Sequence, residues 1–157
     1  MQLYYAPTVT EVTQYTFDPK RVLVVEDDGP MLRTHGRVLE ANGFHPVLMA
    51  DPAEALLEAK GRLPSVVVVD LIMPGMSGME FATRLRNHYG AESPPILLVS
   101  AAVAELEEAE QILFEQLLPK PYPVDALVSA LRLHIGRHAR RRGDMDPIEW
   151  PPTSTGE

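Results

Sequence analysis

The sequence predicts an α/β protein that is built on a doubly wound parallel sheet. Two β-branched runs, VLVV at residues 22–25 and VVVV at 66–69, are continuously apolar, as expected of strands that are covered on both faces. Segments with a helical spacing of apolar residues separate these runs from three weaker ones. Strands that alternate with helices at this spacing form βαβ units, so the strands are parallel and helices cover both faces of the sheet.

Capping residues and apolar stripes place the remaining elements. The weaker strands are expected at residues 47–49, 96–99 and 117–118. Three helices are indicated by the residues that begin or end them, namely Asp28 with Pro30 and Asn42-Gly43, Asp51 with Pro52, and Ser77 with Glu80. An apolar stripe through residues 124–135 indicates the last helix, and the strongly acidic segment 104–114 is also helical in pattern.

Together these elements occupy about residues 20–138. The usual arrangement of five such strands is flavodoxin-like, with strand order 2-1-3-4-5 and a ligand crevice between strands 1 and 3. We expect an N-terminal extension at residues 1–19, the domain at 20–142 and a flexible C-terminal tail at 143–157. The extension is rich in Thr, Val and Tyr, so an added edge strand or an arm toward a neighbour is the alternative to a loosely held terminus.

The composition argues against several classes of protein. A formal net charge of −8 disfavours a protein that coats nucleic acid, and the lack of cysteine excludes disulfides and thiolate metal sites. No apolar run approaches the roughly 20 residues of a membrane span, and the N-terminus does not resemble a secretion signal. The basic residues within 137–142 are interpreted as a solvated helix end rather than a docking patch. We therefore expect a cytoplasmic protein that contacts neither membrane nor nucleic acid.

Acidic residues follow the first and third predicted strands. Glu26, Asp27 and Asp28 follow the first, and Asp70 follows the third. Neighbouring strands lie about 4.8 Å apart, so these carboxylates should converge in the crevice, where like charges repel. Mg²⁺ would offset the repulsion, because it takes one or two carboxylates and keeps waters or phosphate oxygens as its other ligands. Asp28 is instead expected to cap the helix that follows it.

Four segments, in this order, resemble the receiver domain of two-component response regulators. They are VLVVEDD from residue 22, VVVVDLIMPGMSG from residue 66, LLVSA from residue 97 and LLPKP from residue 117. The resemblance covers about residues 20–138 and is similar in layout to chemotaxis-type regulators and phosphorelay intermediates. It implies a signalling domain, not an enzyme with a separate substrate, that accepts a phosphoryl group from a sensor histidine kinase or a phosphotransfer protein.

The resemblance also assigns the phosphoacceptor and the metal ligands by position. Asp70 corresponds to the phosphoacceptor, a carboxylate nucleophile suited to an in-line displacement. Glu26 and Asp27 correspond to the acidic pair that binds Mg²⁺ together with Asp70. The backbone carbonyl of Ile72, two residues past the acceptor, corresponds to the main-chain ligand of the same ion.

Two further residues correspond to the family's contacts with the phosphoryl group. Ser100 matches the hydroxyl residue at the end of strand 4, which can donate a hydrogen bond and draw the following loop inward. Lys120 matches a lysine whose compact, mobile cation pairs first with the acceptor and then with a phosphoryl oxygen. The peptide bond between this lysine and the following proline, here Pro121, is usually cis in the family.

The segment around strand 5 departs from the family pattern. Leu117 stands where an aromatic residue is usual, Phe114 and Glu115 stand near a usual pair of small residues, and the stretch 100–120 is a residue or two short. These changes leave phosphorylation intact but put the usual aromatic coupling in doubt. We expect the loop after Ser100 and the segment 104–114 to carry the switch, with Leu117 held in the core.

Two other functions are alternatives to the receiver. A phosphorylation-independent pseudo-receiver would act only as a binding module, and the intact set of acids argues against it. A phosphatase of the haloacid dehalogenase type would need a DxD motif after the first strand, and Glu26-Asp27-Asp28 does not supply its nucleophile. No output domain follows the predicted receiver in this sequence, so we expect either a stand-alone receiver that acts through a downstream protein target or a receiver cut from a longer protein; a homodimer is left open.

Overall fold

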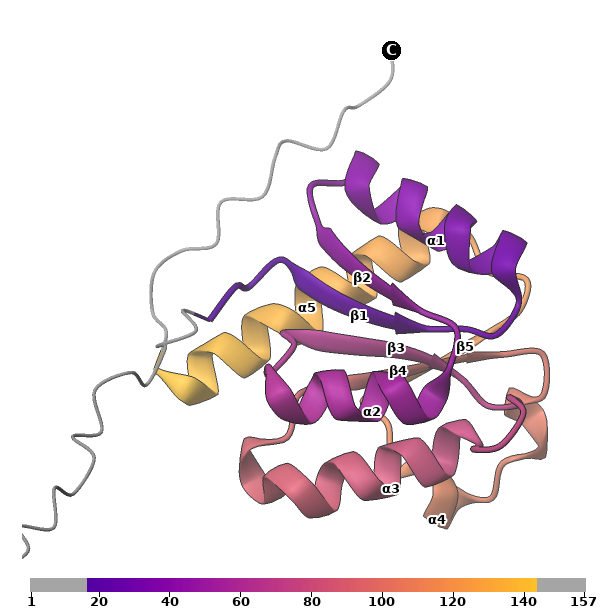
Figure 1. Ribbon diagram of the computed structural model, residues 1–157. Helices are drawn as coiled ribbons and strands as arrows, with labels where there is room; N and C mark the ends of the chain where they lie inside the picture. The colour runs from indigo at the N-terminus through magenta and orange to yellow at the C-terminus, as the bar shows by residue number, and fades with distance from the viewer. Residues whose placement is uncertain (1–16, 144–157) are drawn as a thin grey trace, which may run out of the picture.

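The computed structural model describes residues 17–143. Its strands form one parallel sheet in the order β2-β1-β3-β4-β5 (Figure 1), which confirms the expected flavodoxin-like fold. In chain order the elements are β1 (Arg21–Val25), α1 (Gly29–Ala41), β2 (His45–Met49), α2 (Pro52–Gly61), β3 (Val66–Asp70), α3 (Gly78–Tyr89), the 3-10 turn η1 (Gly90–Glu92), β4 (Ile96–Ser100), the 3-10 turn η2 (Val103–Glu105), α4 (Glu108–Gln111), β5 (Gln116–Pro119) and α5 (Val124–Arg142). The predictions for residues 1–16 and 144–157 lie outside the described residues.

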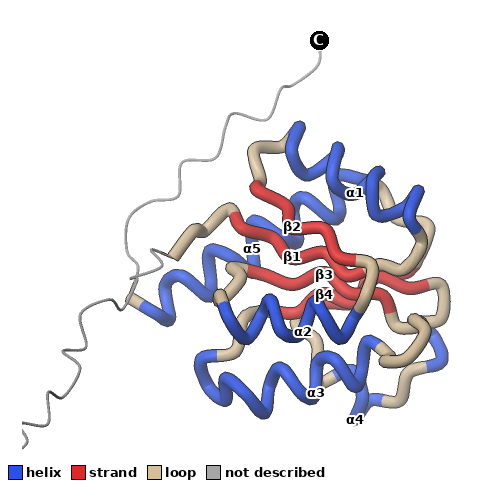
Figure 2. Tube along the Cα trace, in the orientation of Figure 1, coloured by secondary structure: helices blue, strands red, loops and turns tan. Residues whose placement is uncertain are grey.

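Helices cover both faces of the sheet, and each face has its own apolar core. In Figure 2, α1 and α5 lie on one face and α2 and α3 on the other. Successive side chains of a strand point to opposite faces. Leu23 and Val25 therefore pack with α2 and α3, whereas Val22 and Val24 pack with α1 and α5. This double burial explains the continuously apolar strands. No helix among the described residues is long and apolar enough to cross a membrane.

The three helices that were predicted from capping residues begin where expected. The carboxylate of Asp28 accepts a hydrogen bond from the backbone N–H of Met31 at 3.0 Å, so Asp28 caps α1 as predicted. Asp51 caps α2 through the N–H of Ala53 at 2.8 Å, and Ser77 caps α3 through the N–H of Glu80 at 3.1 Å. These bonds satisfy N–H groups that have no partner inside their own helix.

The acidic segment 104–114 does not form the continuous helix that its pattern indicated. It contains part of the turn η2 and the four-residue helix α4, and Leu106 between them is extended, with φ −76° and ψ 133°. Leu106 and Phe114 are buried in the core on the α2–α3 face, which anchors the segment at two points. The six residues 105–110 include four glutamates, and like charges three residues apart disfavour a longer helix.

Candidate functional site

The sheet brings three acidic residues together at the carboxyl edge of its central strands. β1 and β3 are neighbours, with Val25 opposite Val69, so Glu26 and Asp70 follow adjacent strand positions. Carboxylate oxygens of Glu26, Asp27 and Asp70 lie within 4.8 Å of one another. Glu26 is buried, whereas Asp27 is exposed. The arrangement offers several oxygen ligands of the kind that Mg²⁺ prefers.

Lys120 lies between two of these carboxylates. It is the residue after β5, and its Nζ donates to Asp70 Oδ2 at 2.9 Å and to Glu26 Oε2 at 3.1 Å. Its peptide bond to Pro121 is cis, as the family resemblance implies. The Lys120 backbone N–H donates to the carbonyl of Ser100 at 2.9 Å, which holds the end of β5 against the end of β4.

The electrostatics of the cluster follow from burial and charge. Burial raises the pKa of the Glu26 carboxyl above its ordinary value, and the nearby charge of Asp70 adds to this, although Lys120 opposes the shift. Burial alone would lower the pKa of Lys120, but its bonds to Asp70 and Glu26 outweigh that effect, so the lysine pKa is raised. The ammonium group therefore remains charged and offsets part of the repulsion between the acids.

Ser100 and Ile72 lie at the same edge of the sheet. Ser100 ends β4 and is buried, and its Oγ accepts a hydrogen bond from the backbone N–H of Ala102 at 3.1 Å. Ile72 lies in the exposed loop after Asp70, and its backbone N–H points at Asp70 Oδ1 at 3.4 Å. Leu117 is half-buried and packs against the core on the α2–α3 face.

The loop after β3 is held tightly to α3. The backbone N–H of Gly78 donates to the carbonyl of Leu71 at 2.8 Å. A Cβ at Gly78 would lie 2.3 Å from the carbonyl oxygen of Asp70, closer than any side chain tolerates. Glycine is therefore required where α3 meets the end of β3. Asp27 and this loop also border a hollow of about 490 Å³.

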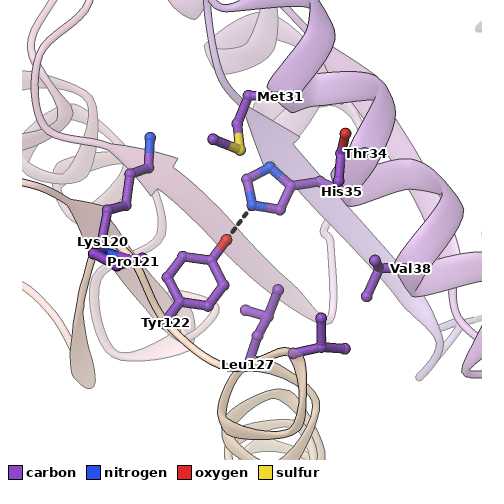
Figure 3. A pocket seen from close by; sticks show the side chains of 9 residues that line it. Met31, Thr34, His35, Val38, Lys120, Pro121, Tyr122 and Leu127 are labelled. Carbon is purple, nitrogen blue, oxygen red and sulfur yellow. Dashed lines mark hydrogen bonds between the residues drawn. The ribbon is translucent and has the colours of Figure 1, made fainter.

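A second hollow lies behind Lys120, and its polar groups were not found from the sequence. It has a volume of about 370 Å³ and lies between α1 and the segment that joins β5 to α5 (Figure 3). His35 of α1 points into it and forms a hydrogen bond with the hydroxyl of Tyr122. The two residues are 87 positions apart, and neither belongs to a recognisable motif, so only the fold reveals the pair.

Comparisons with known proteins agree with this geometry. A family model described as the response regulator receiver domain matches residues 22–132. The response regulator MprA of Mycobacterium sp. (strain KMS) is 31% identical over 131 residues, which cover 82% of this chain but only 56% of that protein. The chain thus spans about half the length of the curated relatives that it matches.

Solved structures give the same result. The receiver domain of the Francisella response regulator 1452 has a TM-score of 0.69 at 25% identity, over 75% of this chain and 98% of that one. A sensor protein from Polaromonas sp. JS666 has a TM-score of 0.69 at 30% identity, over 76% of this chain and 98% of that one. The chain therefore belongs to the family of response regulator receiver domains.

Proposed function

We propose that Asp70 accepts a phosphoryl group from a sensor histidine kinase or a phosphotransfer protein, and that this changes how the domain contacts a downstream protein. The observation that carries the proposal is the position of Lys120 Nζ between Asp70 and Glu26, with Asp27 in the same cluster. A nucleophile, a mobile cation and a set of oxygen ligands thus occupy one edge of the sheet.

The residues present suit a bound Mg²⁺. Three carboxylates crowd within 4.8 Å, and Lys120 supplies one positive charge against them, so the cluster retains excess negative charge. Glu26, Asp27 and Asp70 would hold the ion, together with the backbone carbonyl of Ile72. When bound, the ion neutralises charge on the oxygens of the transferring group.

The transfer step follows from the chemistry of the side chains. An Asp70 carboxylate oxygen attacks phosphorus in line, and a P–O bond forms as the P–N bond of the donor phosphohistidine breaks. The donor imidazole keeps the electron pair of that bond and takes up a proton. Lys120 follows the negative charge from the carboxylate to a phosphoryl oxygen. The Oγ of Ser100 accepts from Ala102, which leaves its hydroxyl proton to donate to the phosphoryl group.

Phosphorylation by a small donor tests the assignment. Full-length protein incubated with acetyl phosphate and Mg²⁺ should gain the mass of one phosphoryl group, and a chelator should prevent the gain. Asp70→Asn should abolish it, because Asp70 is expected to be the sole site. Asp51→Asn is the matched control, since this exposed aspartate also lies near the cluster and asparagine still caps α2.

The same experiment addresses the phosphorylation-independent alternative. The departures around strand 5 and the short α4 are the observations that favour it. A folded wild-type protein that binds no Mg²⁺ and gains no mass would support a pseudo-receiver. Full labelling of the Asp70→Asn variant would instead show that the acceptor has been assigned to the wrong residue.

A further inference from the structure

His35 and Tyr122 join two segments that border the phosphorylation site. The imidazole Nε2 of His35 and the hydroxyl of Tyr122 form a hydrogen bond, and the two rings are nearly parallel, with an interplanar angle of 5° (Figure 3). His35 is 4% exposed. Removal of the Tyr122 hydroxyl would leave the nitrogen of this buried imidazole without its partner, and an unsatisfied buried polar group is costly.

The hydrogen bond between His35 and Tyr122 closes a path of contacts that starts and ends at Lys120. Lys120 Nζ donates to Glu26 Oε2 at 3.1 Å, and the backbone N–H of Asp28 donates to Glu26 Oε1 at 3.3 Å. Asp28 caps α1, and α1 leads in two turns to His35. The bond to Tyr122 then returns to the segment that carries Lys120, two residues away.

The segment that carries Lys120 has few other side-chain anchors. Pro123 is the N-cap residue of α5, and its side chain has no group that could form a capping hydrogen bond. Pro121 has no backbone N–H to donate. The Tyr122 hydroxyl is the one side-chain bond that ties residues 121–123 to the described part of the chain. The Tyr122 hydroxyl therefore supplements the backbone bond from Lys120 to Ser100 in fixing this segment.

We propose that His35 and Tyr122 are a positioning pair that fixes residues 120–122 against α1 and so holds Lys120 Nζ on Asp70. The pair touches neither the acceptor carboxylate nor the metal ligands. It acts through Lys120 alone, whose stem forms part of the same hollow. This role rests on the proposed phosphorylation of Asp70.

The ionisation of the pair suits this role. Burial lowers the pKa of His35, and the charge of Lys120 lowers it further, whereas Asp70 opposes the shift. Burial raises the pKa of Tyr122 to about 12. Near neutral pH the pair is therefore an uncharged imidazole and an intact phenol, and it places no second cation beside Lys120.

One substitution at Tyr122 and two at His35 test the pair. Tyr122→Phe keeps the ring and removes the hydroxyl, and we expect it to slow labelling by acetyl phosphate at saturating Mg²⁺ by about five-fold, the effect of one net hydrogen bond. His35→Leu should slow it to the same extent, whereas His35→Gln can still bond to the hydroxyl and should keep most of the rate. The double variant His35→Leu with Tyr122→Phe should be no slower than either single one, because the two residues act as a unit.

A matched control separates positioning from general loss of packing. Tyr89→Phe removes a hydroxyl that donates to the carbonyl of Ala59 at 2.5 Å, far from Lys120 in the fold, and should keep the wild-type rate. Mg²⁺ affinity should be unchanged in every variant. A wild-type labelling rate for Tyr122→Phe, or additive losses in the double variant, would overturn the proposal.

A second measurement does not depend on phosphorylation. The ammonium protons of Lys120 should exchange slowly with water while they are bonded to Asp70 and Glu26, and nitrogen-15 NMR detects them. Exchange should be faster in Tyr122→Phe and His35→Leu but not in Tyr89→Phe. If the wild-type protein is not labelled but exchange changes in this way, the proposed function fails and the positioning pair stands. Unchanged exchange in these variants would overturn the positioning role of His35 and Tyr122, whatever the labelling shows.

Discussion

Asp27 differs from the two carboxylates beside it, because it makes no hydrogen bond or ion pair with any other residue that the structure describes. Lys120 bonds to Glu26 and to Asp70 but not to Asp27. Without metal, the exposed Asp27 therefore contributes repulsion to the cluster and no compensating contact. In the proposed Mg²⁺ site, Asp27 would be one of the ligands.

Asp27→Ala should therefore separate metal binding from stability. We expect Mg²⁺ affinity to fall at least about ten-fold, since even outer-shell partners of metal ligands have effects of this size. The free energy of unfolding in metal-free buffer should stay the same or rise slightly, because a repelling charge is removed. Titration with Mg²⁺ and denaturant unfolding measure the two quantities.

Asp28→Asn is the control for this prediction. It removes a charge from the adjacent residue, and asparagine still caps α1. Mg²⁺ affinity should change little in this variant. A large loss of metal-free stability in Asp27→Ala would show that Asp27 has a structural role that its exposed position does not reveal.

The sequence predicted the members of the acidic cluster but not the pair formed by His35 and Tyr122 behind Lys120. Glu26 and Asp70 could be paired in advance because they follow strands, and the carboxyl ends of parallel strands meet at one edge. Lys120 and Ser100 were assigned through a family motif. His35 and Tyr122 could not be paired, because their contact depends on how α1 lies against the segment after β5. No local sequence pattern indicates that packing.

At the scale of elements, the junction between β3 and α3 depends on one glycine. The Cβ of an alanine at position 78 would lie 2.3 Å from the carbonyl oxygen of Asp70, which is backbone and cannot swing aside. We expect Gly78→Ala to lower the free energy of unfolding by about 2 kcal/mol, within the usual range for overpacking. It should also slow phosphorylation, because α3 and the acceptor strand must move apart.

Gly61→Ala, in α2, is the matched control. A Cβ there meets nothing within 4 Å, so the change should be neutral or stabilising by a few tenths of a kcal/mol. Denaturant unfolding of both variants gives the comparison. Equal stabilities would mean that the chain accommodates a methyl group beside Asp70 without cost.

The segment from Ser100 to Phe114 is the element most suited to carry the switch. It holds only the turn η2 and the four-residue helix α4, and elements with few helical hydrogen bonds open at low free energy. With beryllofluoride as a phosphoryl mimic, hydrogen exchange in this segment should change. Ser100→Ala should abolish the change, because in the proposed route the serine hydroxyl links the phosphoryl group to the loop.

The exchange experiment also tests Leu117. If its half-buried side chain stays in the core, protection of β5 should be the same with and without beryllofluoride. Unchanged protection between residues 100 and 114 in the wild-type protein would contradict the proposed route. The sequence could not indicate how short α4 is, because its apolar spacing allows a longer helix, while the burial of Leu106 and Phe114 separates the segment into short turns.

At the scale of the whole molecule, the strand order was predictable because both faces of every central strand are apolar. That pattern requires helices on two faces, and short right-handed connections then leave few arrangements. Placement of the polar residues inside the helical layers was less predictable. The helices α1 and α5 carry three buried histidines, although histidine is usually found nearer the surface. They are His35 in α1 and His134 and His138 in α5.

These histidines predict how stability depends on pH. Burial lowers the pKa of each of them below 6.5 in the folded protein. Lys120 near His35 and arginines of α5 near the other two lower it further, whereas the carboxylates of Asp70 and Glu115 oppose the shift. In the unfolded chain they take up protons at their ordinary pKa. At these three sites the unfolded state therefore binds more protons than the folded state below pH 6.5, and their protonation favours unfolding.

The free energy of unfolding should consequently be constant near pH 8 and fall as the pH is lowered from about 7 to 5.5. Each histidine contributes at most about 1.4 kcal/mol per pH unit within this window. His134→Gln should reduce the slope, and the glutamine amide can still donate to Gln116 Oε1, which His134 Nε2 contacts at 3.0 Å. Denaturant unfolding at several pH values gives the slopes. A wild-type stability that is flat down to pH 5.5, or that rises, would mean that these imidazoles are protonated in the folded protein as readily as in the unfolded chain.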